Sequence, residues 1–217
     1  MSEQTSAPRL TGERLVERMT AEERARAARV EQVLPLLREA AVEADARAEF
    51  PLRHVDAFRN AGLLGLVVPA RYGGLGGTLR DLAAATFALG TACPSTALAY
   101  FFHCSSASRG LLALEALEAG LFTAAEARLV EPFAEKLLAK MGRGQRWLAN
   151  FASESVKTAS SAVTISTEAV AVDGGYRLRG TKSFGCSTGV ADEYLVTAKL
   201  QGSSTAEGLA LFFVQRD

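Results

Sequence analysis

The spacing of apolar residues changes once along the chain, close to Leu148, and this change constrains the fold more than any other feature. Before it, apolar residues recur every three to four positions, as in amphipathic helices. After it, Val, Ile, Ala and Thr alternate with polar residues between glycine turns, as in strands. The sequence therefore predicts an α+β chain, in which residues 1–147 form an all-α helical domain and residues 148–217 form the first part of a β-domain.

Capping residues, prolines and glycines delimit the expected helices. Capping-box spacing at 78–81 and 123–126 predicts two helix starts. Pro35 predicts a break or kink, and Gly110 predicts a boundary between two helices. The polar stretch 1–20 is expected to be a mobile arm. Apolar residues at helical spacing are assigned to the inward faces, and they include Leu52, Leu98, Phe101, Phe102 and Leu129.

The second half predicts four antiparallel strands. The glycines after Asp173 tolerate the positive φ of a hairpin turn. Upstream, the run 63–68 is apolar and ends at Pro69, so it is expected to be extended and buried. The glycines at 73–77 are interpreted as a sharp turn, because they lack the strand, helix and acidic partner of a dinucleotide-binding loop. The strands are expected at 163–169, 176–179, 193–200 and 209–215.

Charge and composition exclude several classes of function. The 24 Lys+Arg residues balance the 24 Asp+Glu residues, so nothing favours nucleic acid or an anionic membrane as a partner. The three cysteines and two histidines are widely spaced, which predicts no metal site and a reduced, cytoplasmic setting. No apolar run approaches the ~18 residues of a membrane span. The N-terminus has no apolar core of a secretory signal.

A loop with unusual composition follows Gly180. Small or hydroxylated residues surround one aromatic residue, Phe184. This composition indicates a loop whose backbone and hydroxyl groups contact a flat, polar ligand. The alternative is that Phe184 fills the core of the β-domain and Cys186 acts as a small buried apolar residue. On residue types alone, core packing is the more frequent role.

Two separated blocks of sequence resemble the acyl-CoA dehydrogenase superfamily. The first reads Gly-Thr-Lys at 180–182, then Phe184, then Gly-Val-Ala-Asp at 189–192. The second is Glu-Phe-Pro at 49–51 with the glycine-rich stretch 61–76. The resemblance implies an N-terminal helical domain and a middle β-barrel, with a C-terminal helical bundle beyond them. This chain stops part-way through that barrel, so we expect a fragment with an incomplete antiparallel β-barrel.

The resemblance also implies a flavin site. Phe184 takes the aromatic position beside the isoalloxazine, Cys186 the usual Thr position near N5, and Ser187 the Asn position. The other wall, 154–161, lacks the family's Pro, Gly and Asp. The implied cofactor-binding residues are Phe151, Ser153, Glu154, Phe184, Cys186 and Ser187, and the implied substrate-side residues are Ser160 and His103.

Three further polar side chains are given expected roles. For His103, a hydrogen-bonded structural role is favoured over that of a general base. His54 is expected to be solvated, and Lys182 is interpreted as a positional residue without a catalytic role.

The implied activity is that of a flavin oxidoreductase with FAD, which dehydrogenates an acyl thioester at α,β and passes hydride to the flavin. Acyl-CoA, an electron-transfer flavoprotein or other acceptor, and homo-oligomers are the implied partners, in fatty acid metabolism. The carboxylate base lies in the family's C-terminal domain, so no catalytic residue is assigned here and the fragment alone is expected to be inactive. The alternatives are a flavin-dependent monooxygenase of the same fold and a non-catalytic acyl- or partner-binding remnant.

Overall fold

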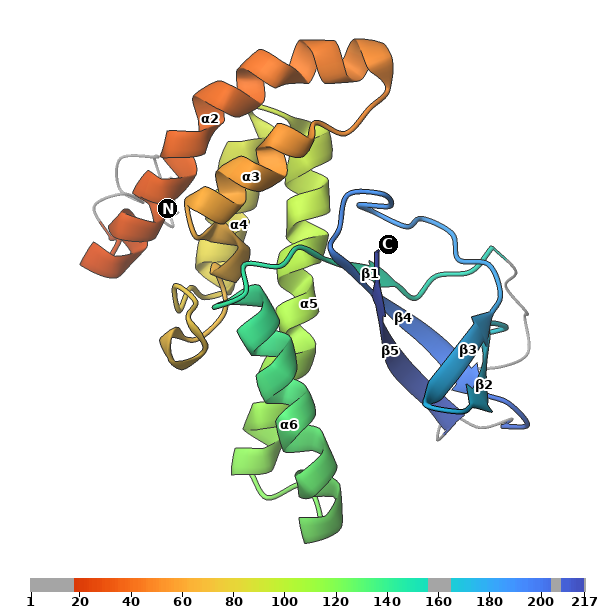
Figure 1. The fold of residues 1–217 in the computed structure, drawn as a ribbon. Helices are drawn as coiled ribbons and strands as arrows, with labels where there is room; N and C mark the ends of the chain where they lie inside the picture. The colour runs from red at the N-terminus through yellow and green to blue at the C-terminus, as the bar shows by residue number, and fades with distance from the viewer. Residues whose placement is uncertain (1–17, 156–164, 204–207, 217) are drawn as a thin grey trace, which may run out of the picture.

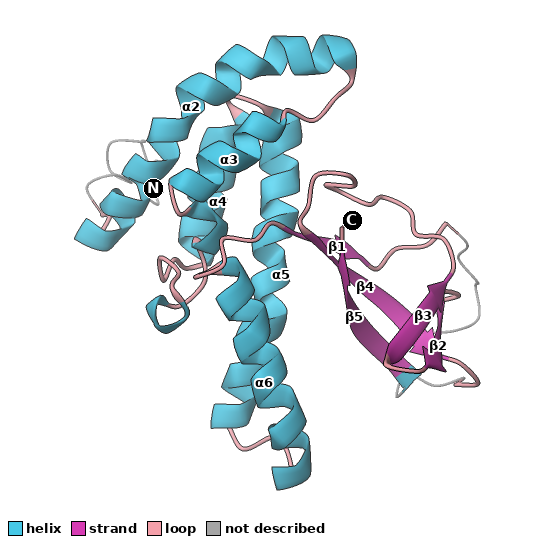
Figure 2. Cartoon of the chain, viewed as in Figure 1, coloured by secondary structure: helices cyan, strands magenta, loops and turns pink. Residues whose placement is uncertain are grey.

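The computed structural model describes residues 18–155, 165–203 and 208–216, which form a helical part followed by a sheet (Figures 1 and 2). This order confirms the predicted α+β class. The predicted arm at 1–20 lies mostly outside the described residues. The helices are α2 (Ala21–Arg47), α3 (Leu52–Asn60), α4 (Leu79–Gly90), α5 (Pro94–Glu118) and α6 (Ala124–Met141), with 3₁₀ turns at Leu63–Gly65 and Ala70–Tyr72. The strands are β1 (Leu148–Phe151), β2 (Glu168–Val172), β3 (Gly175–Arg179), β4 (Glu193–Leu200) and β5 (Leu209–Gln215).

Helix α5 runs through the middle of the molecule and contacts α4, α6 and β1 (Figure 1). One cluster of buried residues joins α2 to α5 with Trp147 and Ala149. A second joins α5 and α6 to the sheet through Leu148 and Leu195. The sheet is therefore anchored to the helices by the residues that enter β1. The predicted division at 147/148 falls in the connection from α6 to β1, and its status as a domain boundary stays a prediction.

The helix starts are confirmed, whereas the predicted boundary at Gly110 is wrong. The capping boxes at Thr78 and Thr123 are both present. Pro35 lies inside α2 and does not end it, so the predicted break is wrong and the alternative of a kink stays a prediction. Gly110 lies inside α5, where a Cβ would come within 2.9 Å of Leu138 Cγ. This glycine therefore serves close packing between α5 and α6, a role that sequence position alone does not distinguish from a helix stop.

Several residues assigned to inward faces are exposed instead. Helix α5 is apolar on more than one face, and the face with Tyr100, Cys104 and Ala107 is the buried one. Helical spacing fixes which residues share a face but not which of two apolar faces is covered. The run 63–68 is buried as predicted, except that it folds into a 3₁₀ turn rather than an extended segment. The exposed residues are Leu52, Leu98, Phe101, Phe102 and Leu129.

The sheet is mixed and open, which corrects the expectation of antiparallel strands throughout. Strands β2 and β3 form the predicted hairpin, and β4 and β5 also pair antiparallel. Strands β1 and β2, however, both run parallel to β4, at its start and its end respectively. Alternation specifies which face of a strand is buried, but it carries no information on the direction of a partner distant in sequence. Residues 163 and 164 of the first predicted strand lie outside the described residues.

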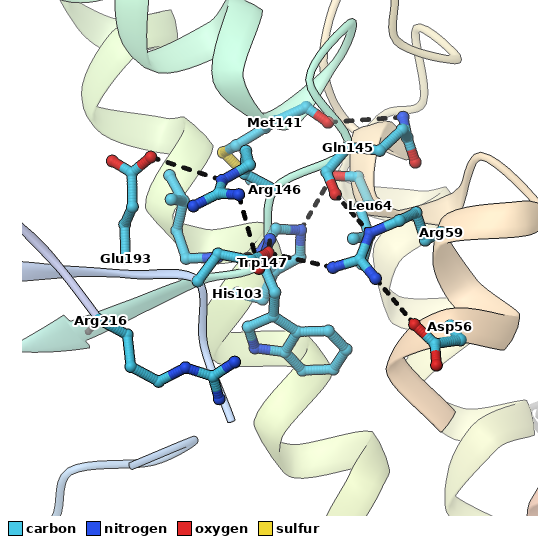
Figure 3. A network of polar contacts seen from close by, with 12 residues as sticks. Asp56, Arg59, Leu64, His103, Met141, Gln145, Arg146, Trp147, Glu193 and Arg216 are labelled. Atoms are coloured by element: carbon cyan, nitrogen blue, oxygen red, sulfur yellow. Dashed lines mark hydrogen bonds and ion pairs between the residues drawn. The ribbon is translucent and has the colours of Figure 1, made fainter. Parts of the chain in front are cut away.

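Polar contacts around Asp192 and Glu193 hold the junction between helices and sheet, and Figure 3 shows Arg59, Trp147 and Glu193 at this junction. Asp192 Oδ2 accepts from the Trp147 backbone N–H at 2.7 Å and from Arg59 Nη2 at 3.2 Å. Glu193, which is buried, pairs with Lys140 Nζ at 2.6 Å. These contacts tie the end of the loop 180–192 to α3 and α6.

Candidate functional site

The loop 180–192 presents Phe184 to solvent. Its ring is 89% exposed, and its backbone has φ of 54°. Ser187 also has a positive φ, 68°. Residues other than glycine rarely adopt this backbone conformation, and such strained residues are enriched at ligand-binding sites. The exposure of Phe184 is inconsistent with the alternative in which this ring fills the core.

The base of the loop is fixed to the protein interior. Ser187 Oγ accepts a hydrogen bond from Trp147 Nε1 at 3.1 Å, and the Tyr194 hydroxyl accepts one from the Gly189 N–H at 3.0 Å. The Phe151 ring stacks on Tyr194 with centroids 4.8 Å apart. A rigid base thus supports an exposed aromatic tip, which suits the binding of a planar group.

The segment 151–155 lies beside this loop. The carbonyl oxygen of Ser153, an exposed residue, accepts a hydrogen bond from the Ser183 N–H at 3.0 Å. The Glu154 carboxylate bonds Lys182 Nζ at 2.6 Å. The structure therefore brings together the predicted cofactor-binding residues Phe151, Ser153, Glu154, Phe184, Cys186 and Ser187. Ser160 lies outside the described residues, and the binding roles themselves stay predictions.

The two histidines are both buried. His103 Nε2 lies 2.8 Å from the Leu64 carbonyl oxygen, and its Nδ1 accepts the Leu148 N–H at 2.9 Å. Both ring nitrogens are thus engaged by backbone, as the structural alternative for His103 predicts. His54 is also fully buried, with Nδ1 2.8 Å from Thr96 Oγ1, so the expectation that it is solvated is wrong. It lies on the same face of α3 as Val55 and Phe58, which turn into the core.

Trp147 is the site residue that sequence reasoning missed. It is fully buried among the rings of Phe50, Phe58, Tyr100 and His103, and it contacts the candidate loop through Ser187. The available signal was that this single tryptophan stands at the point where the periodicity changes.

Two classes of feature are absent from the described part of the chain. No cluster of three metal-ligating side chains occurs there. No helix among residues 18–155, 165–203 and 208–216 is long and apolar enough to cross a membrane.

Comparison with known proteins gives the family. Residues 17–119 match the family described as acyl-CoA dehydrogenase, N-terminal domain. The match with relatives extends into the sheet, to 81% of the chain for a cyclohex-1-ene-1-carbonyl-CoA dehydrogenase of Syntrophus aciditrophicus, at 29% identity. The chain belongs to the acyl-CoA dehydrogenase superfamily. It comprises the N-terminal domain and part of the middle domain of that fold.

Other relatives of the chain are not described as acyl-CoA dehydrogenases. The amino sugar nitrososynthase DnmZ of Streptomyces peucetius is 31% identical over 86% of the chain and 42% of its own length. The solved structure of KijD3 with FMN and a dTDP-linked keto sugar has a TM-score of 0.70 and 28% identity, over 92% of this chain and 46% of that one. The chain thus spans less than half the length of each relative named here, and its match covers 39% of the length of the Syntrophus protein.

Proposed function

We propose that the chain supplies one wall of a flavin site in a flavin-dependent oxidoreductase. The observation that supports this most is the exposed Phe184, one of two non-glycine residues with positive φ in a loop whose base contacts Trp147 and Tyr194. Strained backbone of this kind clusters at ligand-binding sites, so we infer that a ligand covers this ring. KijD3 carries FMN, so a flavin is the planar group favoured by both lines of argument.

The arrangement suits such a group chemically. An aromatic ring at Phe184 packs against a flat, electron-poor ring, and nearby hydroxyl and amide donors stabilise a reduced one. A bound flavin would accept hydride from the substrate. Cys186 is partly exposed and lies outside both core clusters, as a residue that faces a ligand must.

For the reaction, we propose α,β-dehydrogenation of an acyl thioester with FAD as hydride acceptor, in the cytoplasm, with an electron-transfer flavoprotein or similar acceptor and a homo-oligomeric protein. The similarity to a cyclohex-1-ene-1-carbonyl-CoA dehydrogenase supports this substrate class. The Glu154 carboxylate is occupied by neighbouring donors, so we assign it no role as the base.

A second candidate is oxygenation by a reduced flavin, with FMN in place of FAD. It is favoured by the similarity to DnmZ and to KijD3 with FMN, and by the missing Pro, Gly and Asp of the segment 154–161. The non-catalytic alternative requires that no flavin is bound.

The deciding experiment is a visible spectrum and two assays on the full-length protein. Copurified flavin with dye reduction by acyl-CoA supports the dehydrogenase. Oxygen uptake that depends on supplied reduced flavin and a substrate other than acyl-CoA supports the second candidate. Absence of flavin, with no uptake of added FAD or FMN, contradicts both.

Two substitutions in the loop test its orientation. Phe184→Ala is expected to weaken flavin binding by about tenfold, because one aromatic contact contributes on the order of 1 kcal/mol. Cys186→Thr supplies a better hydrogen-bond donor and is expected to raise the flavin potential by roughly 10–30 mV. Redox titration and flavin titration measure these effects. An unchanged potential with a lowered melting temperature for Cys186→Thr would show that Cys186 faces the protein interior.

A further inference from the structure

Glu154 lies where three segments of the sheet half meet, and its carboxylate accepts from five donor groups. Oε2 accepts from the Ser166 N–H at 2.6 Å and the Ser166 hydroxyl at 2.5 Å. Oε1 accepts from the Thr167 N–H at 2.9 Å, the Thr167 hydroxyl at 2.6 Å and Lys182 Nζ at 2.6 Å. The acceptor capacity of both oxygens is thus taken up by the protein itself.

The pair is buried as well as saturated. The side chains of Lys182 and Glu154 are 9% and 3% exposed. Burial opposes ionisation, but the bonds from Lys182, Ser166 and Thr167 outweigh it and hold the pKa of Glu154 well below its usual value. Buried pairs contribute little net stability relative to apolar replacements, whereas they fix geometry strongly.

The same contacts join the two segments that face the candidate site. Lys182 Nζ also donates to the Ala152 carbonyl oxygen at 3.3 Å, and the Ser183 N–H donates to Ser153 at 3.0 Å. Gly180 permits this approach, since a Cβ there would lie 2.5 Å from Thr167 Oγ1. Lys182 and Glu154 therefore link the start of the loop that carries Phe184 to the segment 152–154.

We propose that Glu154 and Lys182 are positioning residues that clamp the loop 180–192 to the segment 152–154, and that Glu154 does not bind the flavin directly. The effect on the flavin rests on the flavin site proposed above. The clamp acts through Phe184 and the loop backbone, and it sets both the affinity for the flavin and the order of the loop.

The test uses Lys182→Met, Glu154→Gln and the double variant in the full-length protein. We expect faster hydrogen exchange at the Ser183 amide, and flavin binding weakened by about tenfold in each single variant. The flavin affinity of the double variant is expected to lie within about twofold of that of the weaker-binding single variant, because the two substitutions break the same linkage. Lys182→Arg restores a cation and a donor and is expected to recover most of the affinity.

The matched control is the ion pair of Lys199 and Glu168, which lies in the same sheet at 3.6 Å and is more exposed. Lys199→Met is expected to change neither exchange at Ser183 nor flavin affinity. If Lys182→Met does not fold, Ser166→Ala, which removes a single donor, gives the same readouts at smaller amplitude.

Two failures are distinguishable. If the unsubstituted protein binds neither FAD nor FMN, the flavin site is contradicted, and exchange at Ser183 decides whether the clamp exists. Flavin binding and Ser183 exchange that are equal in the unsubstituted protein, Lys182→Met and Glu154→Gln would overturn the clamp. Additive effects in the double variant would show that the two residues act separately, and that the proposal is wrong.

Discussion

Replacing Trp147 with alanine is expected to lower the free energy of unfolding by about 3–5 kcal/mol, the range for aromatic truncation in a core. The indole is fully buried, with the rings of four neighbours at centroid distances from 5.2 to 6.2 Å. The substitution also removes the donor to Ser187 Oγ. Because Trp147 is the only tryptophan in the chain, urea unfolding should be followed by circular dichroism rather than by fluorescence.

Two controls separate packing from the hydrogen bond. Phe184→Ala also removes an aromatic ring, but an exposed one, and should change stability by less than about 0.5 kcal/mol. Ser187→Ala removes the acceptor of the Trp147 Nε1–H and leaves the indole in place, so its loss should be smaller than that of Trp147→Ala. Equal losses for Trp147→Ala and Phe184→Ala would show that the junction does not depend on the indole.

The fold could be predicted from the sequence where the information is local. The capping boxes at Thr78 and Thr123 lie within one helical turn, and the residues themselves specify the helix start. The hairpin between β2 and β3 is likewise encoded by its own turn, where Gly174 has φ of 75°. The parallel pairing of β1 with β4 joins segments more than 40 residues apart, and no local pattern specifies it.

The same distinction applies to single residues. Gly110 and Pro35 both carry signals of helix ends, yet both lie inside helices. A contact with a distant helix decides the role of Gly110, whose missing side chain admits Leu138. The sequence predicts a solvated His54, whereas the ring is buried and its Nδ1 lies 2.8 Å from Thr96 Oγ1 of α5, a partner that lies 42 residues away.

The candidate site could be predicted only as a set of positions. The motif at 180–192 predicts the position of the loop, and the structure adds that Phe184 is exposed and that two non-glycine residues there have positive φ. Glu154 was predicted to contact the cofactor, but its five donors come from segments that no motif connects to it. Networks of buried polar groups depend on three-dimensional approach, which explains why sequence patterns identify their members and miss their partners.

Acidification from pH 7 to pH 5 is expected to lower the free energy of unfolding by about 2 kcal/mol through His103 alone. Burial lowers the pKa of His103 from 6.5 to about 4, so the folded protein keeps the ring neutral in this range. The unfolded chain takes up a proton below about pH 6.5. The contribution is therefore complete above that pH, is lost as the pH falls, and levels off once the folded state also protonates near pH 4.

Urea unfolding at several pH values between 5 and 7 measures this slope, in a window above the range in which carboxyl groups titrate. The matched variant is His103→Gln, whose amide can donate to Leu64 O and accept from Leu148 N without titrating. It should remove the share of the slope that belongs to His103. His54, whose pKa burial also lowers to about 4, should retain its own share in that variant, and His54→Gln isolates it. A slope unchanged in His103→Gln would mean that His103 has the same pKa in the folded and the unfolded protein, and would contradict the lowered pKa of the buried ring.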